Sequence, residues 1–264
     1  MQKLQHKVAV ITGAASGIGA ATATQFFEDG AYLALADINA EAGPALVDAY
    51  GGAERCLFVT TDVSDSGQID ALIHATEARF GGIDILFNNA GIGTFGATEG
   101  LTDADWQRIM DIDVNSVFYG CRAAIPSMKQ RGGGAIINTA SVSGMGGDYN
   151  FSAYNAAKGA VINYTRNLAL DLGRFNIRAN AVCPGLIETP LARGLTRNEN
   201  IATYYVEHHP MRRLGQAEEV AQVVRFLASD DASYVNGAII PVDGGLTASN
   251  GQPNFAHMLG MVDN

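Results

Sequence analysis

A tyrosine and a lysine, Tyr154 and Lys158, stand four positions apart in a stretch whose apolar residues recur at helical spacing. Side chains at that spacing share one face of a helix. A phenol has an ordinary pKa of about 10 and is a poor base at neutral pH, but a neighbouring ammonium favours the phenolate. The pair is therefore suited to exchange a proton with the oxygen of an alcohol.

A serine, Ser141, comes shortly after an apolar stretch at residues 135–139 that is predicted to be a strand. Its hydroxyl would hold a substrate oxygen at the carboxyl end of that strand. Taken alone, a tyrosine and a lysine at this spacing arise by chance in many helices, and a single serine says less. Whether these three residues indicate an active site therefore depends on the other motifs in the chain.

A glycine-rich turn supplies the second piece of chemistry. The first apolar stretch, Val8–Thr12, runs into a turn that opens a helical stretch and contains Gly13, Ser16, Gly17, Ile18 and Gly19. Glycines allow a tight turn and the close approach of a pyrophosphate, to which the helix offers unpaired N–H groups and its positive dipole end. A plain turn is the alternative, but the position between a first strand and a helix favours dinucleotide binding.

The choice of cofactor depends on Asp37, at the end of the second apolar stretch. A carboxylate there accepts hydrogen bonds from the adenosine ribose hydroxyls and repels a 2′-phosphate. Ala15 in the turn and Ile38 after the carboxylate offer no positive charge to such a phosphate. The sequence therefore predicts NAD rather than NADP; the alternative is that Asp37 only begins the turn into Asn39.

Short apolar, β-branched stretches alternate with helical patterns along the chain. Nearly continuous hydrophobic strands are typical of a parallel sheet covered on both faces. The alternation predicts an α/β fold of the Rossmann type, a doubly wound, mostly parallel seven-stranded sheet with helices on both faces. No linker or repeat divides it, so residues 1–264 are predicted to form a single NAD-binding catalytic domain. The predicted strands are Val8–Thr12, Tyr32–Ala36, Leu57–Thr61, Ile83–Phe87, Ala135–Thr139, Ile177–Val182 and Ala238–Val242.

Cap residues mark the predicted helices. Asn39 is a candidate N-cap for the second helix, and the next helix runs up to Gly81. Thr102 and Asp105 form a predicted capping box, which opens a helix with apolar residues at helical spacing as far as Val117.

Two segments do not fit the alternation. Residues 185–215 are long and irregular between a strand and a helix, and long loops in compact domains are usually functional or mobile. This segment leaves the carboxyl end of a strand, where ligands bind in such sheets, so it is predicted to be the substrate loop. The tail, residues 247–264, follows the last strand.

The composition of the chain limits which partners it is expected to bind and where in the cell it is expected to act. The chain has 17 Lys and Arg against 27 Asp and Glu, a net charge of −10, which argues against binding to nucleic acid or to an anionic membrane. No apolar run approaches the roughly 20 residues of a membrane helix, and no secretory signal is recognised. The 3 cysteines form no CxxC and no histidine spacing suggests a metal site. We therefore predict a cytoplasmic protein with reduced thiols and no metal.

Together these features resemble the short-chain dehydrogenase/reductase family, in its short, single-domain, NAD-preferring branch. The match covers roughly residues 7–245. It rests on motifs that occur in the family's order: Thr12–Gly19, Asp62–Val63, Asn88–Gly91, Asn115, Ser141, Tyr154–Lys158 and Pro184–Gly185.

The resemblance implies a role for each matching residue. Tyr154 would be the general acid and base, Lys158 would support it and bind the nicotinamide ribose, and Ser141 would orient the substrate oxygen. Asn115 would hold a water linking Lys158 to solvent through a local distortion of its helix; an ordinary packing amide is the alternative. The other residues would contact the cofactor: Asp62 and Val63 the adenine, Asn89, Ala90 and Gly91 the adenosine ribose, and Pro184, Gly185, Ile187 and Thr189 the nicotinamide carboxamide.

The implied reaction is hydride transfer between NAD(H) and a secondary alcohol or ketone. The residues expected around the substrate are mostly apolar and no arginine faces them, which favours a neutral, partly apolar molecule: a cyclic or aromatic alcohol, a diol or a steroid-like compound. Loop packing is the alternative for each of them. They are Gly93, Phe95, Val142, Met145, Tyr149, Leu186, Leu191 and Leu195.

Two other functions compete with this one. An NADPH-dependent 3-oxoacyl-type reductase is disfavoured by Asp37 and by the lack of a positive charge beside it. A nonenzymatic NAD-sensing protein on the same fold would be indicated by loss of Tyr154 or Lys158, and both are present.

The resemblance also implies a homotetramer, usually built from the helices that contain Trp106 and Tyr154 and from the last strand. The tail is unusually apolar for a solvated segment, and we expect it to contact a neighbouring subunit; folding back on its own subunit is the alternative. Its apolar residues are Phe255, Met258, Leu259, Met261 and Val262.

Overall fold

Apolar stretches of the chain form the strands of one parallel sheet in the computed structural model, which describes residues 2–261. Neighbouring strands follow the order β3-β2-β1-β4-β5-β6-β9, and every pair is parallel. The winding reverses between β1 and β4, as in doubly wound folds. The predicted seven-stranded sheet is confirmed. Its strands are β1 (Val8–Thr12), β2 (Tyr32–Asp37), β3 (Cys56–Thr60), β4 (Ile85–Asn88), β5 (Gly134–Thr139), β6 (Ile177–Pro184) and β9 (Ile239–Val242).

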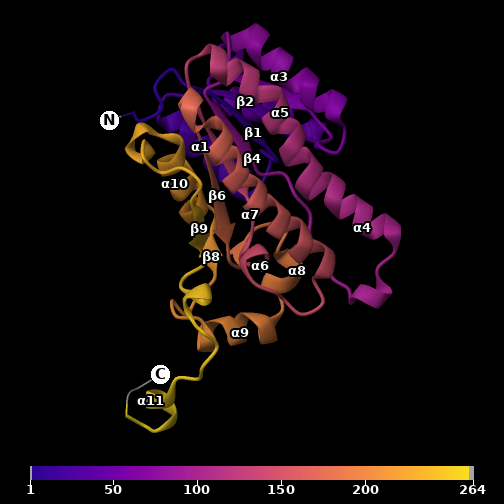
Figure 1. Ribbon diagram of the computed structural model, residues 1–264, viewed down its shortest axis with the longest axis vertical. Coiled ribbons are helices and arrows are strands. Elements are labelled where there is room, and N and C mark those ends of the chain that lie inside the picture. The colour runs from indigo at the N-terminus through magenta and orange to yellow at the C-terminus, as the bar shows by residue number, and fades with distance from the viewer. Residues whose placement is uncertain (1, 262–264) are drawn as a thin grey trace.

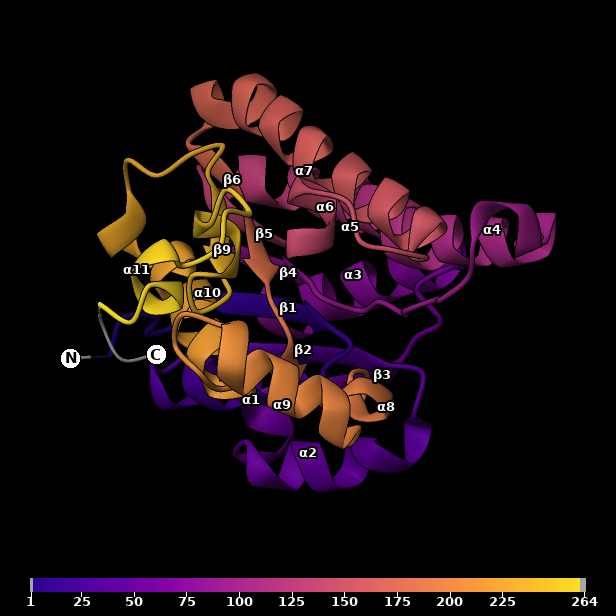
Figure 2. The same cartoon turned by 90° about the horizontal axis from the view of Figure 1, so that it is seen from below.

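Helices cover both faces of the sheet, as the views in Figures 1 and 2 show. One face carries α1 (Gly17–Glu28), α2 (Gly43–Ala49) and α10 (Ala217–Ala228). The other carries α3 (Ser66–Phe80), α5 (Ser116–Gln130) and α7 (Ser152–Leu172). Among the described residues, no helix combines the length and the apolar composition needed to cross a membrane.

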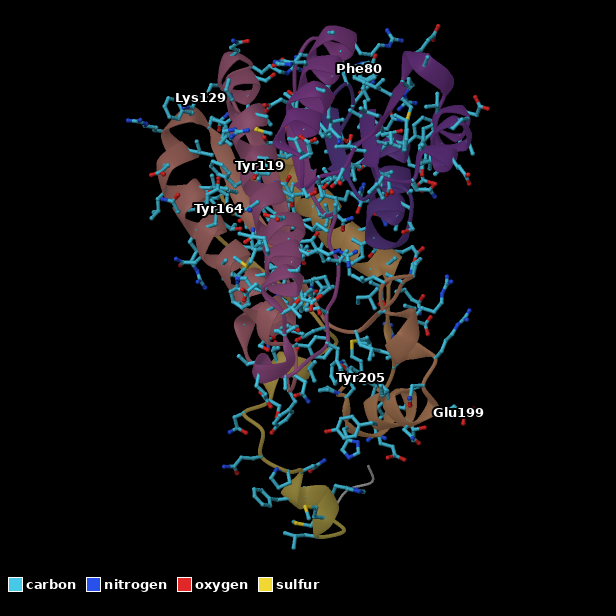
Figure 3. All side chains as sticks on the ribbon, turned by 90° about the vertical axis from the view of Figure 1, so that its right-hand side faces the viewer. Phe80, Tyr119, Lys129, Tyr164, Glu199 and Tyr205 are labelled. Atoms are coloured by element: carbon cyan, nitrogen blue, oxygen red, sulfur yellow. The ribbon has the colours of Figure 1, made fainter. Side chains whose placement is uncertain are left out.

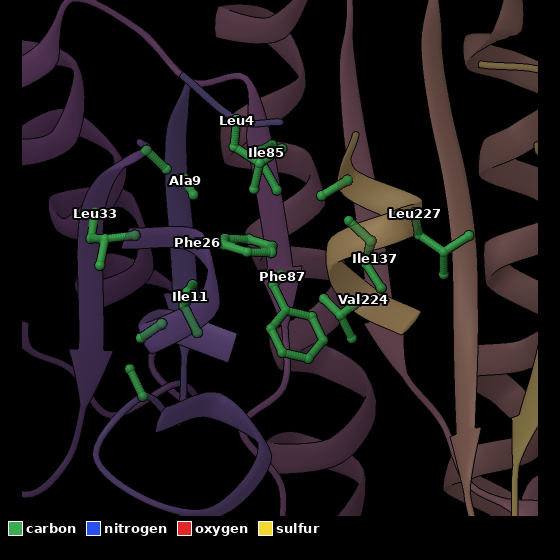
Figure 4. Packing of buried hydrophobic residues seen from close by; sticks show 14 of the residues in the cluster. Leu4, Ala9, Ile11, Phe26, Leu33, Ile85, Phe87, Ile137, Val224 and Leu227 are labelled. Atoms are coloured by element: carbon green, nitrogen blue, oxygen red, sulfur yellow. The ribbon is translucent and has the colours of Figure 1, made fainter. Parts of the chain in front are cut away.

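Burial on both faces explains why the central strands contain so few polar residues. All residues of β1 are buried; Ala9 and Ile11 pack into the layer of α1 and α10, whereas Val10 packs into the opposite layer. Figure 4 shows Phe26 of α1 and Phe87 of β4 inside the first of these layers. Burial of each side chain of this size contributes about 1.5–3 kcal/mol to the free energy of unfolding.

Two predicted caps are present and one is displaced. The Thr102 hydroxyl accepts from the Asp105 N–H at 3.1 Å, within a capping box, and α3 ends at Gly81 in the left-handed region. Asn39 caps only a 3₁₀ turn, Ala40–Ala42, because α2 begins afresh with Pro44 in its first turn, where a missing N–H costs nothing.

The helix predicted from Thr102 to Val117 is interrupted. It consists of α4 (Asp103–Met110), a π-helical turn (Asp111–Asn115) and then α5. A π turn inserts an extra residue and is frequent at functional sites. Figure 3 shows Tyr119 on α5 and Tyr164 on the neighbouring α7.

The prediction that residues 185–215 are irregular is wrong. The segment contains β7 (Ile187–Glu188), α8 (Arg193–Thr196) and α9 (Glu199–His208), and it ends at β8 (Gly215–Gln216), which pairs with β7. The side chain of Asn198 starts α9 by accepting from the Asn200 and Ile201 N–H groups. Figure 3 shows Glu199 and Tyr205 on α9, and Figure 1 shows α8 and α9 beyond the carboxyl edge of the sheet.

The tail extends away from the sheet. After a 3₁₀ turn (Leu246–Ala248) it forms α11 (Phe255–Met258), which lies at the far end of the molecule in Figure 1. Phe255 is 57% exposed, and Met258, Leu259 and Met261 are more than 70% exposed. The tail therefore does not bury these side chains on its own subunit. Val262 lies outside the described residues.

The remaining short elements connect these layers. They are α6 (Val142–Met145) and the 3₁₀ turns Gly52–Glu54, Thr98–Gly100, Gly173–Phe175 and Asp230–Ala232.

Candidate active site

The predicted site residues gather at the carboxyl edge of the sheet, because parallel strands all end there. They follow or end successive strands: the glycine-rich turn at β1, Asp37 at β2, Asp62 at β3, Asn89 at β4, Ser141 at β5 and Pro184 at β6. The edge beside β1 and β4, where the winding reverses, is the place at which such sheets bind a dinucleotide.

The turn after β1 has the shape that a pyrophosphate needs. Gly13 and Gly17 have φ angles of 65° and 54°, which favour glycine. A Cβ at Gly19 would lie 2.1 Å from the Gly13 carbonyl oxygen, so only glycine fits there. Ser16 precedes α1 without capping it, which leaves the first N–H groups of the helix available to an anion.

Asp37 points its carboxylate at this turn. Its Oδ2 accepts from the Ala15 N–H at 2.9 Å and its Oδ1 accepts from the Asn39 N–H at 3.0 Å. Each carboxylate oxygen has a second lone pair for another donor. The arrangement fits a ribose diol. The next residue, Ile38, is 70% exposed and carries no charge that could bind a 2′-phosphate.

The segment after β4 is tied to the turn by hydrogen bonds. The Thr12 hydroxyl accepts from the N–H groups of Asn89 and Ala90 at 3.0 and 3.1 Å. Asn89 Nδ2 donates in return to the carbonyls of Thr12 and Gly13. A Cβ at Gly13 would lie 2.9 Å from Ala90 Cα, so these two loops form one surface.

Asp62 and Val63 lie further along the same edge. Asp62 Oδ1 accepts from the N–H and the hydroxyl of Ser64 at 2.9 and 2.7 Å, and Val63 is buried. The side chain of Asp62 thus shapes its own loop, and its implied contact with an adenine stays a prediction.

The segment after β6 closes over the turn. A Cβ at Gly17 would lie 3.2 Å from the methyl group of Thr189, so Thr189 stands above the glycine-rich turn. Gly185 donates its N–H to the Val242 carbonyl at 3.1 Å, Pro184 ends β6, and Ile187 is buried. Thr189, one of the residues implied to hold the nicotinamide, therefore faces the turn that is expected to hold the phosphates.

The packing of α6 on α7 places the short helix that Ser141 caps against the helix that carries Tyr154 and Lys158. Ser141 caps α6 by accepting from the Ser143 N–H at 3.2 Å. Gly144 lets α6 approach closely, since a Cβ there would lie 2.5 Å from the Lys158 carbonyl carbon. Lys158 Nζ lies 5.6 Å from the centroid of the Tyr154 ring and donates to the Thr139 carbonyl at 3.1 Å.

Asn115 lies at the end of the π-helical turn. Its Nδ2 donates to Asp111 Oδ1 at 2.8 Å, so its amide is held within its own segment. The backbone distortion that the resemblance implies is present, while the water it would hold stays a prediction.

Several residues expected around the substrate are exposed on the surface. Phe95, Tyr149 and Leu191 are 70%, 95% and 60% exposed. The ring of Phe151 lies 5.3 Å from that of Phe95 and 6.2 Å from that of Tyr154, which joins Phe95 to the predicted acid and base.

The three cysteines, Cys56, Cys121 and Cys183, are free and buried. Burial raises the pKa of Cys183 to about 11, although the nearby Lys158 charge opposes the rise. Such a thiol is almost wholly protonated at neutral pH and is unreactive. Within residues 2–261, no group of three or more His, Cys, Asp or Glu side chains is placed to hold a metal ion.

Known proteins show the same organisation. The model of one protein family, described as Enoyl-(Acyl carrier protein) reductase, matches residues 13–247. A meso-2,3-butanediol dehydrogenase from Serratia marcescens is 43% identical over 96% of this chain and 99% of its own. A cyclohexanol dehydrogenase from Acinetobacter sp. is 42% identical over 93% and 97%. The crystal structure of levodione reductase matches with a TM-score of 0.89 and 40% identity, over 93% of this chain and 99% of that one.

The chain belongs to the short-chain dehydrogenase/reductase family. Membership confirms the predicted class of reaction, hydride transfer between a nicotinamide cofactor and a secondary alcohol or ketone.

Two contributors to this short-chain dehydrogenase/reductase site were absent from the sequence prediction. Asp113 pairs with Lys158 at 3.0 Å, and Phe151 contacts both Phe95 and Tyr154. The only sequence signal for Asp113 is its position two residues before Asn115, and the signal for Phe151 is its position three residues before Tyr154.

Replacing Thr12 with valine tests the link between the two cofactor loops. Thr12 is 4% exposed, and valine keeps its shape but leaves two buried N–H groups without an acceptor. We expect the free energy of unfolding to fall by about 1–3 kcal/mol, measured by chemical denaturation. Thr12→Ser keeps the hydroxyl and is the control; an equal loss in both variants would show that the hydrogen bonds contribute nothing.

Proposed function

We propose that this protein is an NAD-dependent short-chain alcohol dehydrogenase and ketone reductase. The observation that carries the proposal is the position of Tyr154 and Lys158 on one face of α7, against the short helix α6 that Ser141 caps and beside Gly91 in the segment after β4. A phenol, an ammonium and a hydroxyl beside the proposed dinucleotide site are the groups that reversible proton exchange with an alcohol requires.

Each group has its own part in the reaction. The Ser141 hydroxyl orients the substrate oxygen. Tyr154 as the phenolate accepts the hydroxyl proton during oxidation and returns it as the phenol during reduction. Lys158 stabilises the phenolate by its charge. A nicotinamide cofactor bound beside these residues would supply the chemistry of hydride transfer.

The proposed cofactor is NAD. The support is the geometry of Asp37, whose two carboxylate oxygens are anchored on the Ala15 and Asn39 N–H groups. A carboxylate so anchored cannot swing away from a 2′-phosphate, and both the repulsion and the lost ribose hydrogen bonds disfavour NADP. The same argument disfavours an NADPH-dependent 3-oxoacyl-type reductase.

The proposed substrate is a neutral, partly apolar secondary alcohol or its ketone, such as a cyclic alcohol or a diol. The exposed side chains of Phe95 and Leu191 offer apolar surface, and the ring of Phe95 contacts that of Phe151 beside Tyr154. The names of the butanediol and cyclohexanol dehydrogenases among its relatives agree with this chemistry.

Tyr154→Phe tests the proposed acid and base. The phenyl ring keeps the packing against Phe151 but exchanges no proton, so kcat for alcohol oxidation should fall by about 100-fold or more. NADH affinity, measured by fluorescence titration, should change little. Turnover close to that of the wild type, followed as NADH absorbance over a panel of secondary alcohols, would remove Tyr154 from the mechanism.

Asp37→Ala tests the choice of cofactor. Loss of charge-assisted hydrogen bonds to the ribose should weaken NAD binding by about 1.5–3 kcal/mol and narrow the preference for NAD over NADP. Steady-state kinetics with both cofactors measure the change. The control is Asp65→Ala, which removes an exposed carboxylate that caps α3. An unchanged ratio of the two values of kcat/KM would contradict the role of Asp37.

We further propose a homotetramer in which the tail packs on a neighbouring subunit. The support is the exposure of Phe255, Met258, Leu259 and Met261 on their own subunit, because a cluster of this kind needs a surface to cover it. Trp106, on one of the helices from which the resemblance implies that the tetramer is built, is also partly exposed, at 43%.

Truncation after Thr247 tests the tail. Loss of the apolar cluster should weaken the tetramer, measured by sedimentation, and should raise the KM of the alcohol if the tail covers a neighbour's substrate loop. A tenfold rise corresponds to about 1.4 kcal/mol. A stable tetramer with an unchanged KM would show that the tail serves neither assembly nor the site.

A further inference from the structure

A fully buried carboxylate, Asp113, lies beneath the proposed active site. Asp113 is 0% exposed, and its Oδ2 lies 3.0 Å from Lys158 Nζ, which is itself almost completely buried. Apart from this ion pair, Oδ2 has no hydrogen-bond partner among the described residues. An isolated buried charge is very unfavourable, so each member of the pair depends on the other.

The backbone around Asp113 orients the carboxylate toward Lys158. Asp113 sits in the π-helical turn, and its Oδ1 accepts from the Ile92 N–H at 2.9 Å, which fixes the orientation of the carboxylate. Gly91 leaves room for the pair, since a Cβ there would lie 3.3 Å from Asp113 Oδ2 and 3.4 Å from Lys158 Nζ. Three elements of the chain therefore meet at this contact.

Groups from each element packed around Lys158 determine the charge of its amine. Asp113 faces it from the π-helical turn, Tyr154 from α7, Cys183 from β6 and the Thr139 carbonyl from β5. Burial alone would lower the pKa of Lys158, but the negative charge of Asp113 and that of an ionised Tyr154 outweigh it and raise the pKa above its ordinary value. Cys183 is a protonated thiol at neutral pH, so Asp113 is the counter-ion of Lys158 whenever Tyr154 holds its proton.

We propose that Asp113 is a positioning residue whose carboxylate anchors the charged ammonium of Lys158 at the floor of the site, facing Tyr154. The carboxylate touches neither substrate nor reacting atoms. It acts by keeping a cation in a buried place that would otherwise favour the neutral amine, so that the cation is present to stabilise the Tyr154 phenolate. This inference rests on the proposed function only for its effect on turnover.

The charge of Lys158 can be measured directly, because the chain contains only four lysines: Lys3, Lys7, Lys129 and Lys158. Labelling the lysine ε-carbons with ¹³C gives few signals, and Lys158→Arg assigns the one of interest. In the wild type, Lys158 should titrate at a pH no lower than the other lysines. In Asp113→Asn, which keeps an oxygen for the Ile92 N–H, its midpoint should fall by at least about two pH units.

Two variants separate the charge of Asp113 from its contribution to stability. Asp113→Glu keeps a carboxylate, and Lys158 should then titrate within about one pH unit of the wild type. Asp84→Asn removes another buried carboxylate, paired with Arg131 at 2.8 Å at the opposite end of the sheet. It should lower stability and leave the Lys158 titration unchanged.

Turnover supplies an independent readout. Alcohol oxidation by Asp113→Asn at neutral pH should be slower by about 10- to 100-fold, whereas Asp84→Asn should keep the wild-type rate while folded. If the wild type oxidises no alcohol, the proposed function fails, but the lysine titration still decides the role of Asp113.

Several results would overturn the inference. They are a wild-type Lys158 that titrates below the other lysines, an Asp113→Asn midpoint that does not move, or an Asp113→Glu midpoint as low as that of the asparagine variant. If Asp113→Asn does not fold, the titrations of the wild type and of the glutamate variant decide the role of Asp113 by the same criteria.

Discussion

The parallel pairing of every strand in the sheet is the constraint on which the site depends. Because all strands point the same way, the turns that follow β1, β2, β3, β4, β5 and β6 arrive at one edge. The winding of the sheet reverses between β1 and β4, which is the point at which doubly wound sheets bind their ligands. Thr12 bridges the two strands at this point, where its hydroxyl accepts two backbone N–H groups from the segment after β4.

Close backbone contacts determine how the elements meet at this edge of the sheet. Gly19 touches the Gly13 carbonyl, and Gly144 lies on the backbone of α7 at Lys158. In each place a side chain would separate two elements by more than the site allows. The absence of a Cβ at these positions is therefore as much a part of the site as the reactive groups.

Charge in the interior imposes a second requirement. Lys158 is positioned by helical spacing beside Tyr154, but that position lies inside the protein, where an amine tends to lose its proton. Asp113 supplies the negative charge that keeps the amine protonated. The π-helical turn places Asp113 beside Lys158, and the Ile92 N–H orients its carboxylate. A buried ion pair of this kind adds little to the free energy of unfolding, so its main effect is to keep the Lys158 amine protonated beside Tyr154.

The sequence by itself determined the parallel sheet, the glycine-rich turn, Asp37 and the spacing of Tyr154 and Lys158, because each follows from local rules of burial, backbone conformation or helical periodicity. It also indicated that the segment after β6 belongs to the site, but not that this segment forms α9, which begins where the Asn198 side chain accepts from the Asn200 and Ile201 N–H groups. Only the tertiary structure decided which groups meet across the sheet edge. Asp113 reaches Lys158, Phe95 reaches Phe151, and Thr189 stands over Gly17, because residues from separate elements become neighbours only when the layers pack. No periodicity within one segment carries that information.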